Sequence, residues 1–173
     1  MRIPNVVGGS IDLSDLKLVK LDDAEFERLR MQAGDLLLVR TNGNREYVGR
    51  CAVFDGDVET EPHTNRNFVY ASYLIRARLR LNEYNPYFVQ TYLSSGQGRK
   101  AMLARAKTSA GQFNINTESL RSILLPAPPR ELQDEFAARS ARIRSAINAQ
   151  FKIAEKQETL FSSLQSRAFS GQL

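Results

Sequence analysis

Side chains that could hydrogen-bond to double-stranded DNA gather in three polar segments of this sequence, within residues 40–45, 63–67 and 96–114. Guanidinium and amide groups bond bidentately to guanine and adenine edges, and Lys and hydroxyl groups suit phosphates. The candidate DNA contacts in these segments are Arg40, Thr41, Asn42, Asn44, Arg45, His63, Asn65, Arg66, Gln97, Arg99, Lys100, Lys107, Ser109, Gln112 and Asn114. Each segment alone is unspecific, but three of them in one small basic chain predict a DNA-binding surface.

The positive charge is concentrated in the middle of the chain. The 173 residues have a net charge of +5, and residues 74–112 carry seven Lys or Arg side chains against one acid, Glu83. Such an excess attracts phosphates, although a solvated basic face would have the same composition. Arg76, Arg78 and Arg80 either contact phosphates or pair with the acids of residues 1–73.

Residues that catalysis or metal binding would need form no recognisable pattern. Asp55 and Asp57 flank a turn glycine, which explains them without catalysis. Cys51 is the only cysteine and His63 the only histidine, so an internal disulfide and the usual zinc sites are excluded. We expect a buried Cys51, and no catalytic site, metal or bound cofactor in this chain.

No apolar run approaches the roughly 20 residues that a membrane span needs, and residues 1–10 lack the features of a signal peptide. The chain is 42% hydrophobic and 25% charged, as in ordinary globular proteins. We therefore expect a cytoplasmic protein with no membrane contact.

The sequence pattern of residues 1–129 predicts an α+β domain with β-hairpins and helices, and these elements must position the polar segments. A short helix is expected within residues 22–31. The apolar run at 35–39 predicts a buried strand that returns as a hairpin over 47–54. Apolar and basic residues alternate in part of residues 68–81, which predicts a strand with a basic face.

Apolar residues fall at helical spacing after Pro86, with a break at residues 94–98 and a second helical stretch around Met102. A one-turn helix is expected at 117–120, capped by Asn116 or Thr117. The prolines at 126, 128 and 129 mark the end of the domain.

Residues 130–173 predict a long helical arm with a coiled-coil pattern. Spacings alternating between four and three residues define a seam that is apolar at both ends and polar in the middle. The seam consists of Phe136, Ser140, Ile143, Ile147, Gln150, Ala154, Gln157, Phe161, Leu164 and Ala168. A helix of this length cannot bury such a stripe alone, so we expect it to pack on a helix of another copy or another protein. The alternative is that it folds back on its own domain.

Several motifs resemble, in the correct order, the specificity subunits of type I restriction-modification systems. They cover nearly the whole chain and are residues 34–49 (GDLLLVRTNGNREYVG), 85–88 (NPYF), 114–116 (NIN), 125–129 (LPAPP) and 160–173 (LFSSLQSRAFSGQL).

The resemblance implies a target-recognition domain for one half of a split DNA site and a spacer helix that docks the methyltransferase and restriction subunits. S-adenosylmethionine, ATP and Mg²⁺ would then belong to those partner subunits. The family has two recognition domains and two spacer helices in tandem, whereas this chain has one of each and is expected to lack the first part of the domain. We expect a half-subunit or a fragment. Two copies would associate through antiparallel helices and bind a palindromic split site.

A second hypothesis stays open: an interaction adaptor whose coiled coil binds another protein and whose basic domain binds an acidic partner. Steep salt dependence and sequence preference in DNA binding would favour the first hypothesis, and indifference to DNA the second.

Overall fold

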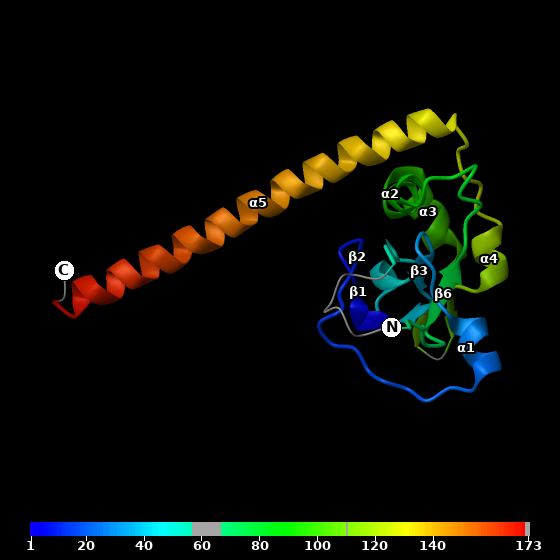
Figure 1. Cartoon of the computed structure of the whole chain (residues 1–173), viewed down its shortest axis with the longest axis horizontal. Helices are drawn as coiled ribbons and strands as arrows, with labels where there is room; N and C mark the ends of the chain where they lie inside the picture. The colour runs from blue at the N-terminus through cyan, green and yellow to red at the C-terminus, as the bar shows by residue number, and fades with distance from the viewer. Residues whose placement is uncertain (57–66, 110, 172–173) are drawn as a thin grey trace. The chain divides into compact units, whose positions relative to one another are not determined.

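The structure, a computed structural model, describes residues 1–56, 67–109 and 111–171. These residues divide into two units, Met1–Gln133 and Asp134–Leu173. Short antiparallel sheets and helices build the first unit, and the second is helical (Figure 1). The expected α+β class is therefore confirmed.

The central sheet of the first unit has the strand order β5-β3-β6 and is antiparallel. Strand β3 (Leu36–Val39) lies between β5 (Cys51–Val53) and β6 (Leu74–Ala77). All four β3 side chains are buried, which explains the uninterrupted apolar run. The expected β3–β5 hairpin is confirmed, but its return strand is shorter than residues 47–54, because η2 (Arg45–Tyr47) is a 3-10 helix and a turn follows it at residues 48–49.

The two faces of β3 support two hydrophobic clusters. The helix-side core contains Leu36, Leu38, Val48, Cys51, Val53, Ile75, Val89, Leu93, Met102, Ile115 and Ile123. The hairpin-side core contains Val6, Met31, Leu37, Val39, Ala52, Phe54 and Leu74. Alternate residues of β3 thus enter opposite cores, as the period of a strand requires.

Helices α2 (Pro86–Ser94) and α3 (Gly96–Arg105) cover the helix-side core (Figure 1). The Asn85 side chain caps α2 by accepting from the Tyr87 N–H at 2.9 Å. The break expected over residues 94–98 is confirmed only at Ser95, because Ser94 ends α2 and Gly96 begins α3. Gly98 is required here, because a Cβ at this position would lie 2.1 Å from the Tyr92 carbonyl oxygen.

The hairpin-side core is covered by elements from the start of the chain. They are η1 (Ile3–Asn5), β1 (Val6–Val7) and its antiparallel partner β2 (Ser10–Ile11). Helix α1 (Asp23–Leu29) follows and confirms the short helix expected within 22–31. Its N-cap, Asp22, accepts from the Glu25 N–H at 2.7 Å.

A second antiparallel sheet has the strand order β4-β8-β7. Its strands are β4 (Thr41–Asn42), β7 (Lys107–Ser109) and β8 (Gln112–Asn114). Helix α4 (Thr117–Arg121) follows β8, and Asn116, one of the two expected caps, accepts from the Ser119 N–H at 2.7 Å.

Helix α5 (Arg130–Phe169) is 40 residues long, and its first turn belongs to the first unit. Gln133 explains why: its side chain is fully buried, accepts from the Asn85 N–H and donates to the Glu83 and Pro128 carbonyls, each at 2.9 Å. The unit therefore ends after Gln133, whereas the prolines had placed the boundary after residue 129. No helix in the part of the chain that the structure describes is long and apolar enough to cross a membrane.

Candidate nucleic-acid interface

Strand pairing joins two of the three predicted polar segments in one sheet. Thr41 pairs with Asn114, and Asn114 pairs with Lys107 on its other side. Ser109 pairs with Gln112. The segments at 40–45 and 96–114 therefore lie side by side although they are far apart in the sequence.

The register places five predicted DNA contacts on one face of this sheet. Directly paired residues of an antiparallel sheet share a face, as do residues two positions apart on a strand. We call this the polar sheet face, which consists of Thr41, Lys107, Ser109, Gln112 and Asn114. Phe113 lies on the opposite face and packs against the helix-side core. The polar sheet face therefore points away from the core, and Lys107, Ser109 and Gln112 are exposed.

Hydrogen bonds hold some side chains of the polar sheet face in place and leave other polar groups of the face available. The Thr41 hydroxyl lies 3.0 Å from Gln112 Oε1 and donates to it, which leaves the Gln112 amide hydrogens free to donate elsewhere. Asn114 Nδ2 donates to the Gln112 carbonyl at 3.3 Å. The Lys107 ammonium contacts no acid among the described residues. The face thus offers amide, hydroxyl and ammonium groups for a ligand.

Side chains in and beside the turn after β4 that were predicted to contact DNA form hydrogen bonds within the protein. Asn42 Oδ1 accepts from the Asn44 N–H, and Asn44 Oδ1 accepts from the Glu46 N–H, both at 2.9 Å. These are Asx turns, which stabilise a tight reversal. Arg45 Nη2 donates to the Leu103 carbonyl at 3.1 Å and ties the turn to α3. Because Asn42 belongs to β4, the segment is the end of a sheet strand rather than a free hairpin tip.

Arg99 also has a structural role that the sequence did not indicate. Its guanidinium donates to the Val48 and Glu46 carbonyls, both at 2.7 Å, and its side chain is only 16% exposed. Burial lowers the pKa of Arg99 from its ordinary value. Gln97 and Lys100 are exposed on the same helix. DNA contact by these three residues stays a prediction. Arg99 is the least available of the three, because its guanidinium already donates to backbone carbonyls.

The strand predicted over residues 68–81 is shorter than expected, because β6 ends at Ala77 and leaves Arg78 and Arg80 beyond it. All three arginines of this segment have partners within the first unit. Arg78 forms a bidentate pair with Asp35, which confirms the expected pairing with an acid of residues 1–73. Arg80 lies 3.1 Å from Glu83. Arg76 donates to the Arg30 carbonyl and stacks over the Tyr70 ring at 5.5 Å. Of these three, Arg78 has the least freedom to contact a phosphate.

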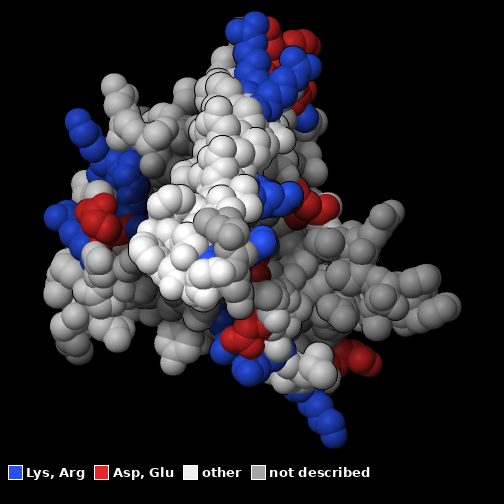
Figure 2. Space-filling model, turned by 90° about the vertical axis from the view of Figure 1, so that its left-hand side faces the viewer, with Lys and Arg blue, Asp and Glu red and all other residues white. Residues whose placement is uncertain are grey.

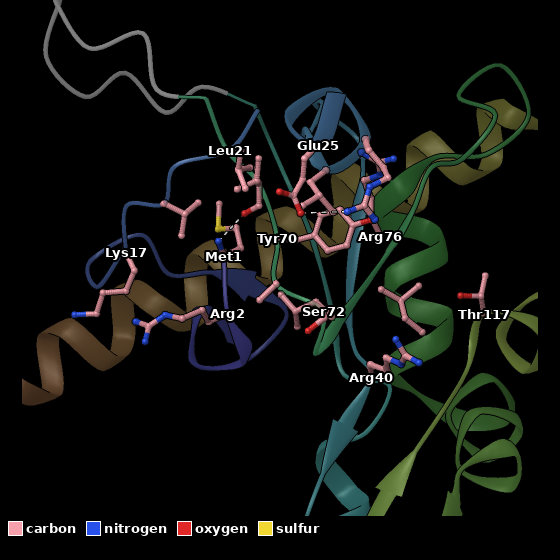
Figure 3. A pocket seen from close by; sticks show the side chains of 17 residues that line it. Met1, Arg2, Lys17, Leu21, Glu25, Arg40, Tyr70, Ser72, Arg76 and Thr117 are labelled. Carbon is pink, nitrogen blue, oxygen red and sulfur yellow. Dashed lines mark hydrogen bonds and ion pairs between the residues drawn. The ribbon is translucent and has the colours of Figure 1, made fainter. Parts of the chain in front are cut away.

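A groove that the sequence did not predict lies beside the hairpin-side core (Figure 3). It has a volume of about 720 Å³ and is lined mainly by residues of α1, β6 and the segments before them, together with Thr117 of α4. Its charged lining residues are Arg2, Lys17, Glu25, Arg28, Arg40 and Arg76. We call it the basic groove. Its cations come from separate parts of the sequence, and only Arg40 belongs to a predicted polar segment.

His63, Asn65 and Arg66 lie outside the described residues. Cys51 is buried as expected, and burial raises its pKa to about 11, so its thiol stays protonated at neutral pH. Across residues 1–56, 67–109 and 111–171, no group of acids, His and Cys could hold a metal ion.

Comparison with known proteins shows what the chain is similar to. The specificity subunit of the type I restriction enzyme EcoKI, from Escherichia coli K12, is 30% identical across the whole chain, which covers 37% of that relative. The specificity subunit of the type I restriction enzyme StySPI, from Salmonella potsdam, is 28% identical over 90% of the chain and 33% of the relative. A third relative, from Methanocaldococcus jannaschii, is 24% identical over 90% of the chain and 36% of its own length.

No protein-family model matches the chain. The chain spans between 33% and 37% of the length of these relatives. The similarity nevertheless extends over both units, from the first sheet to the long helix. The resemblance found in the motifs is thus confirmed, and the chain is similar to the specificity subunits of type I restriction enzymes.

Proposed function

We propose that this chain binds double-stranded DNA in a sequence-specific manner and reads one half of a split target. The observation that carries the proposal is the polar sheet face, where five predicted DNA contacts from two distant segments meet on one open surface. Amide and hydroxyl groups on such a surface suit base edges, and Lys107 suits a phosphate. The similarity to specificity subunits supports the same role.

Helix α5 supports the second part of the proposal, which concerns partners. All side chains of residues 141–170 are exposed. Among the apolar seam residues, Ile143 is 62% exposed and Phe161 is 56% exposed. Figure 2 faces the C-terminal end of this helix, where the surface is largely uncharged. Apolar seam residues left in water at both ends of the seam favour association with another helix.

We propose that α5 pairs with α5 of a second copy, antiparallel, and that the paired helices dock methyltransferase and restriction subunits. A twofold dimer presents two identical recognition domains, so its target would be a split palindrome. In this proposal the chain directs modification and cutting without catalysing either. S-adenosylmethionine, ATP and Mg²⁺ would bind to the partner subunits.

A selection experiment tests the proposal directly. The purified chain is sized by light scattering and incubated with a pool of randomised duplexes at moderate salt, and the retained duplexes are sequenced. We expect a dimer that enriches a split palindrome. Enrichment of one undivided half-site would support DNA recognition but contradict the dimer. A chain that retains no duplex above background would contradict DNA recognition and favour the adaptor hypothesis.

A further inference from the structure

The basic groove combines an excess of cations with an open surface. Five cations and one acid line it, and the cations are Arg2, Lys17, Arg28, Arg40 and Arg76. Figure 3 shows Lys17 and Arg2 on one side of the groove and Arg76 and Arg40 on the other. Positive side chains that face one groove from both sides concentrate positive electrostatic potential there, and this potential attracts an extended polyanion.

The partners of these cations are exchangeable. Arg2 and Lys17 share Asp15, at 2.7 and 3.5 Å, and the Asp15 side chain is 64% exposed. Arg28 pairs with Glu25 at 3.3 Å on the surface. Exposed ion pairs of this kind contribute little to stability, so a phosphate can replace the carboxylate at little cost.

Arg40 is the most available cation of the groove. Its side chain is exposed and makes no hydrogen bond or ion pair with the other described residues. Its backbone is fixed at both sides, because the N–H donates to the Tyr73 carbonyl and the carbonyl accepts from the Ile115 N–H, each at 2.9 Å. A free guanidinium on a fixed backbone is well suited to bind a phosphate.

The position of Arg40 connects the groove to the polar sheet face. Arg40 directly precedes β4, and Thr117, which also lines the groove, is the third residue after β8. The groove therefore begins where the sheet ends. A duplex whose bases contact Gln112 and Asn114 would extend its backbone toward Arg40.

We propose that the basic groove binds the sugar–phosphate backbone beside the bases that the polar sheet face reads. This inference rests on the proposed function and adds a separate surface to it. Contacts to phosphates position a protein on DNA without selecting sequence. The groove therefore supplies affinity and salt dependence, whereas the polar sheet face supplies the sequence preference.

The test removes two groove charges in the full-length chain, by the substitutions Arg40→Gln and Lys17→Gln together. The probe is the duplex enriched by the wild-type chain, and binding is measured by fluorescence anisotropy over a series of salt concentrations. We expect the slope of log K against log salt to fall in magnitude by about 1.8, since each lost phosphate contact accounts for about 0.9. A repeated selection should enrich the same sequence.

The control is the double substitution Lys152→Gln and Lys156→Gln on α5, which changes the net charge equally but lies outside the groove. It should keep the wild-type slope. As a second measurement on the unaltered chain, the duplex should slow acetylation of Lys17 at least several-fold, so the test does not depend on the folding of a variant.

The outcomes separate this inference from the proposed function. If the wild-type chain binds no duplex, both are overturned. If it binds but the groove variant keeps the wild-type slope and Lys17 is not protected, only the groove proposal is overturned, and another anion such as an acidic protein segment becomes its candidate ligand.

Discussion

The guanidinium of Arg78 donates to both oxygens of the Asp35 carboxylate, from Nε and Nη2, each at 2.8 Å. Asp35 is only 1% exposed, and it also accepts from the Gln32 N–H at 2.8 Å. The hydrogen bonds and the positive charge compensate the desolvation of the buried carboxylate. The same interaction raises the pKa of Arg78 and joins the residue after β6 to the turn before β3.

The first prediction follows from this pair. Arg78→Met leaves the Asp35 carboxylate without its cation and should lower the free energy of unfolding by about 2–3 kcal/mol. This is less than for a fully enclosed pair, because the Arg78 side chain is 44% exposed and water can replace it in part. Urea denaturation measures the change. Arg80→Met is the control, since the Arg80 side chain is 77% exposed, and its loss should change stability by less than about 1 kcal/mol. Equal effects of the two substitutions would contradict the structural role of the pair.

Gly98 provides the second prediction. A Cβ at residue 98 would lie 2.1 Å from the Tyr92 carbonyl oxygen, so Gly98→Ala must separate α2 from α3. Overpacking of this kind typically costs about 1–3 kcal/mol, and we expect at least that loss in thermal unfolding. At Gly43 an added Cβ meets nothing within 4 Å, so Gly43→Ala is the matched control and should remain close to wild type. A Gly98→Ala protein as stable as this control would contradict the close packing of residue 98 against the Tyr92 carbonyl.

The third prediction separates two roles within the polar sheet face. Gln112→Ala removes an amide that can contact a base edge and should relax sequence preference at one position, by about 1–3 kcal/mol of discrimination. Lys107→Ala removes a phosphate-type cation and should weaken binding to all sequences alike. Competition binding with duplexes changed one base pair at a time measures both effects. Identical preference profiles for the Gln112 variant and the wild type would remove Gln112 from the reading surface.

The buried thiol of Cys51 makes stability depend on pH. Desolvation raises its pKa from 9.0 to about 11 in the folded chain, so between these values the unfolded chain binds fewer protons than the folded one. Its contribution is therefore fully present below pH 9 and is lost as the pH rises toward 11. Urea denaturation at several pH values should show stability falling more steeply for the wild type than for Cys51→Ala. Parallel curves would show that the thiol titrates normally.

The fifth prediction tests the proposed pairing of α5. Ile147 is 45% exposed and lies in the seam, so Ile147→Asp places a charge where the second helix should pack. The dissociation constant of the dimer should rise more than tenfold, as measured by sedimentation equilibrium. Arg142→Asp, also exposed but outside the seam, should have a much smaller effect. A dimer that tolerates both substitutions equally would use a different surface.

Local patterns in the sequence were sufficient for several elements of the fold. The apolar run before Arg40 predicted the buried strand β3, and the spacing of Phe88, Val89, Tyr92 and Leu93 predicted α2. The cap at Asn116 and the long helix after Arg130 were predicted in the same way. These features depend on residues close in the chain, whose periodicity and capping chemistry are visible without a structure.

The end of the first unit was less predictable, because Gln133 is a polar residue that becomes fully buried. Its burial depends on carbonyl and N–H groups of residues 83, 85 and 128, which no local pattern reveals. A buried glutamine with satisfied hydrogen bonds therefore extended the unit beyond the prolines.

The sequence by itself determined the polar residue types, the central concentration of positive charge, the helical arm and the resemblance to specificity subunits. Only the tertiary structure decided that Thr41 lies opposite Asn114, that Arg99 holds the turn after β4, and that Arg40 shares a groove with Lys17. The physical reason is that strand register and groove walls arise from contacts between distant segments. Their hydrogen bonds and packing are determined by the folded core, not by the neighbours of each residue in the chain.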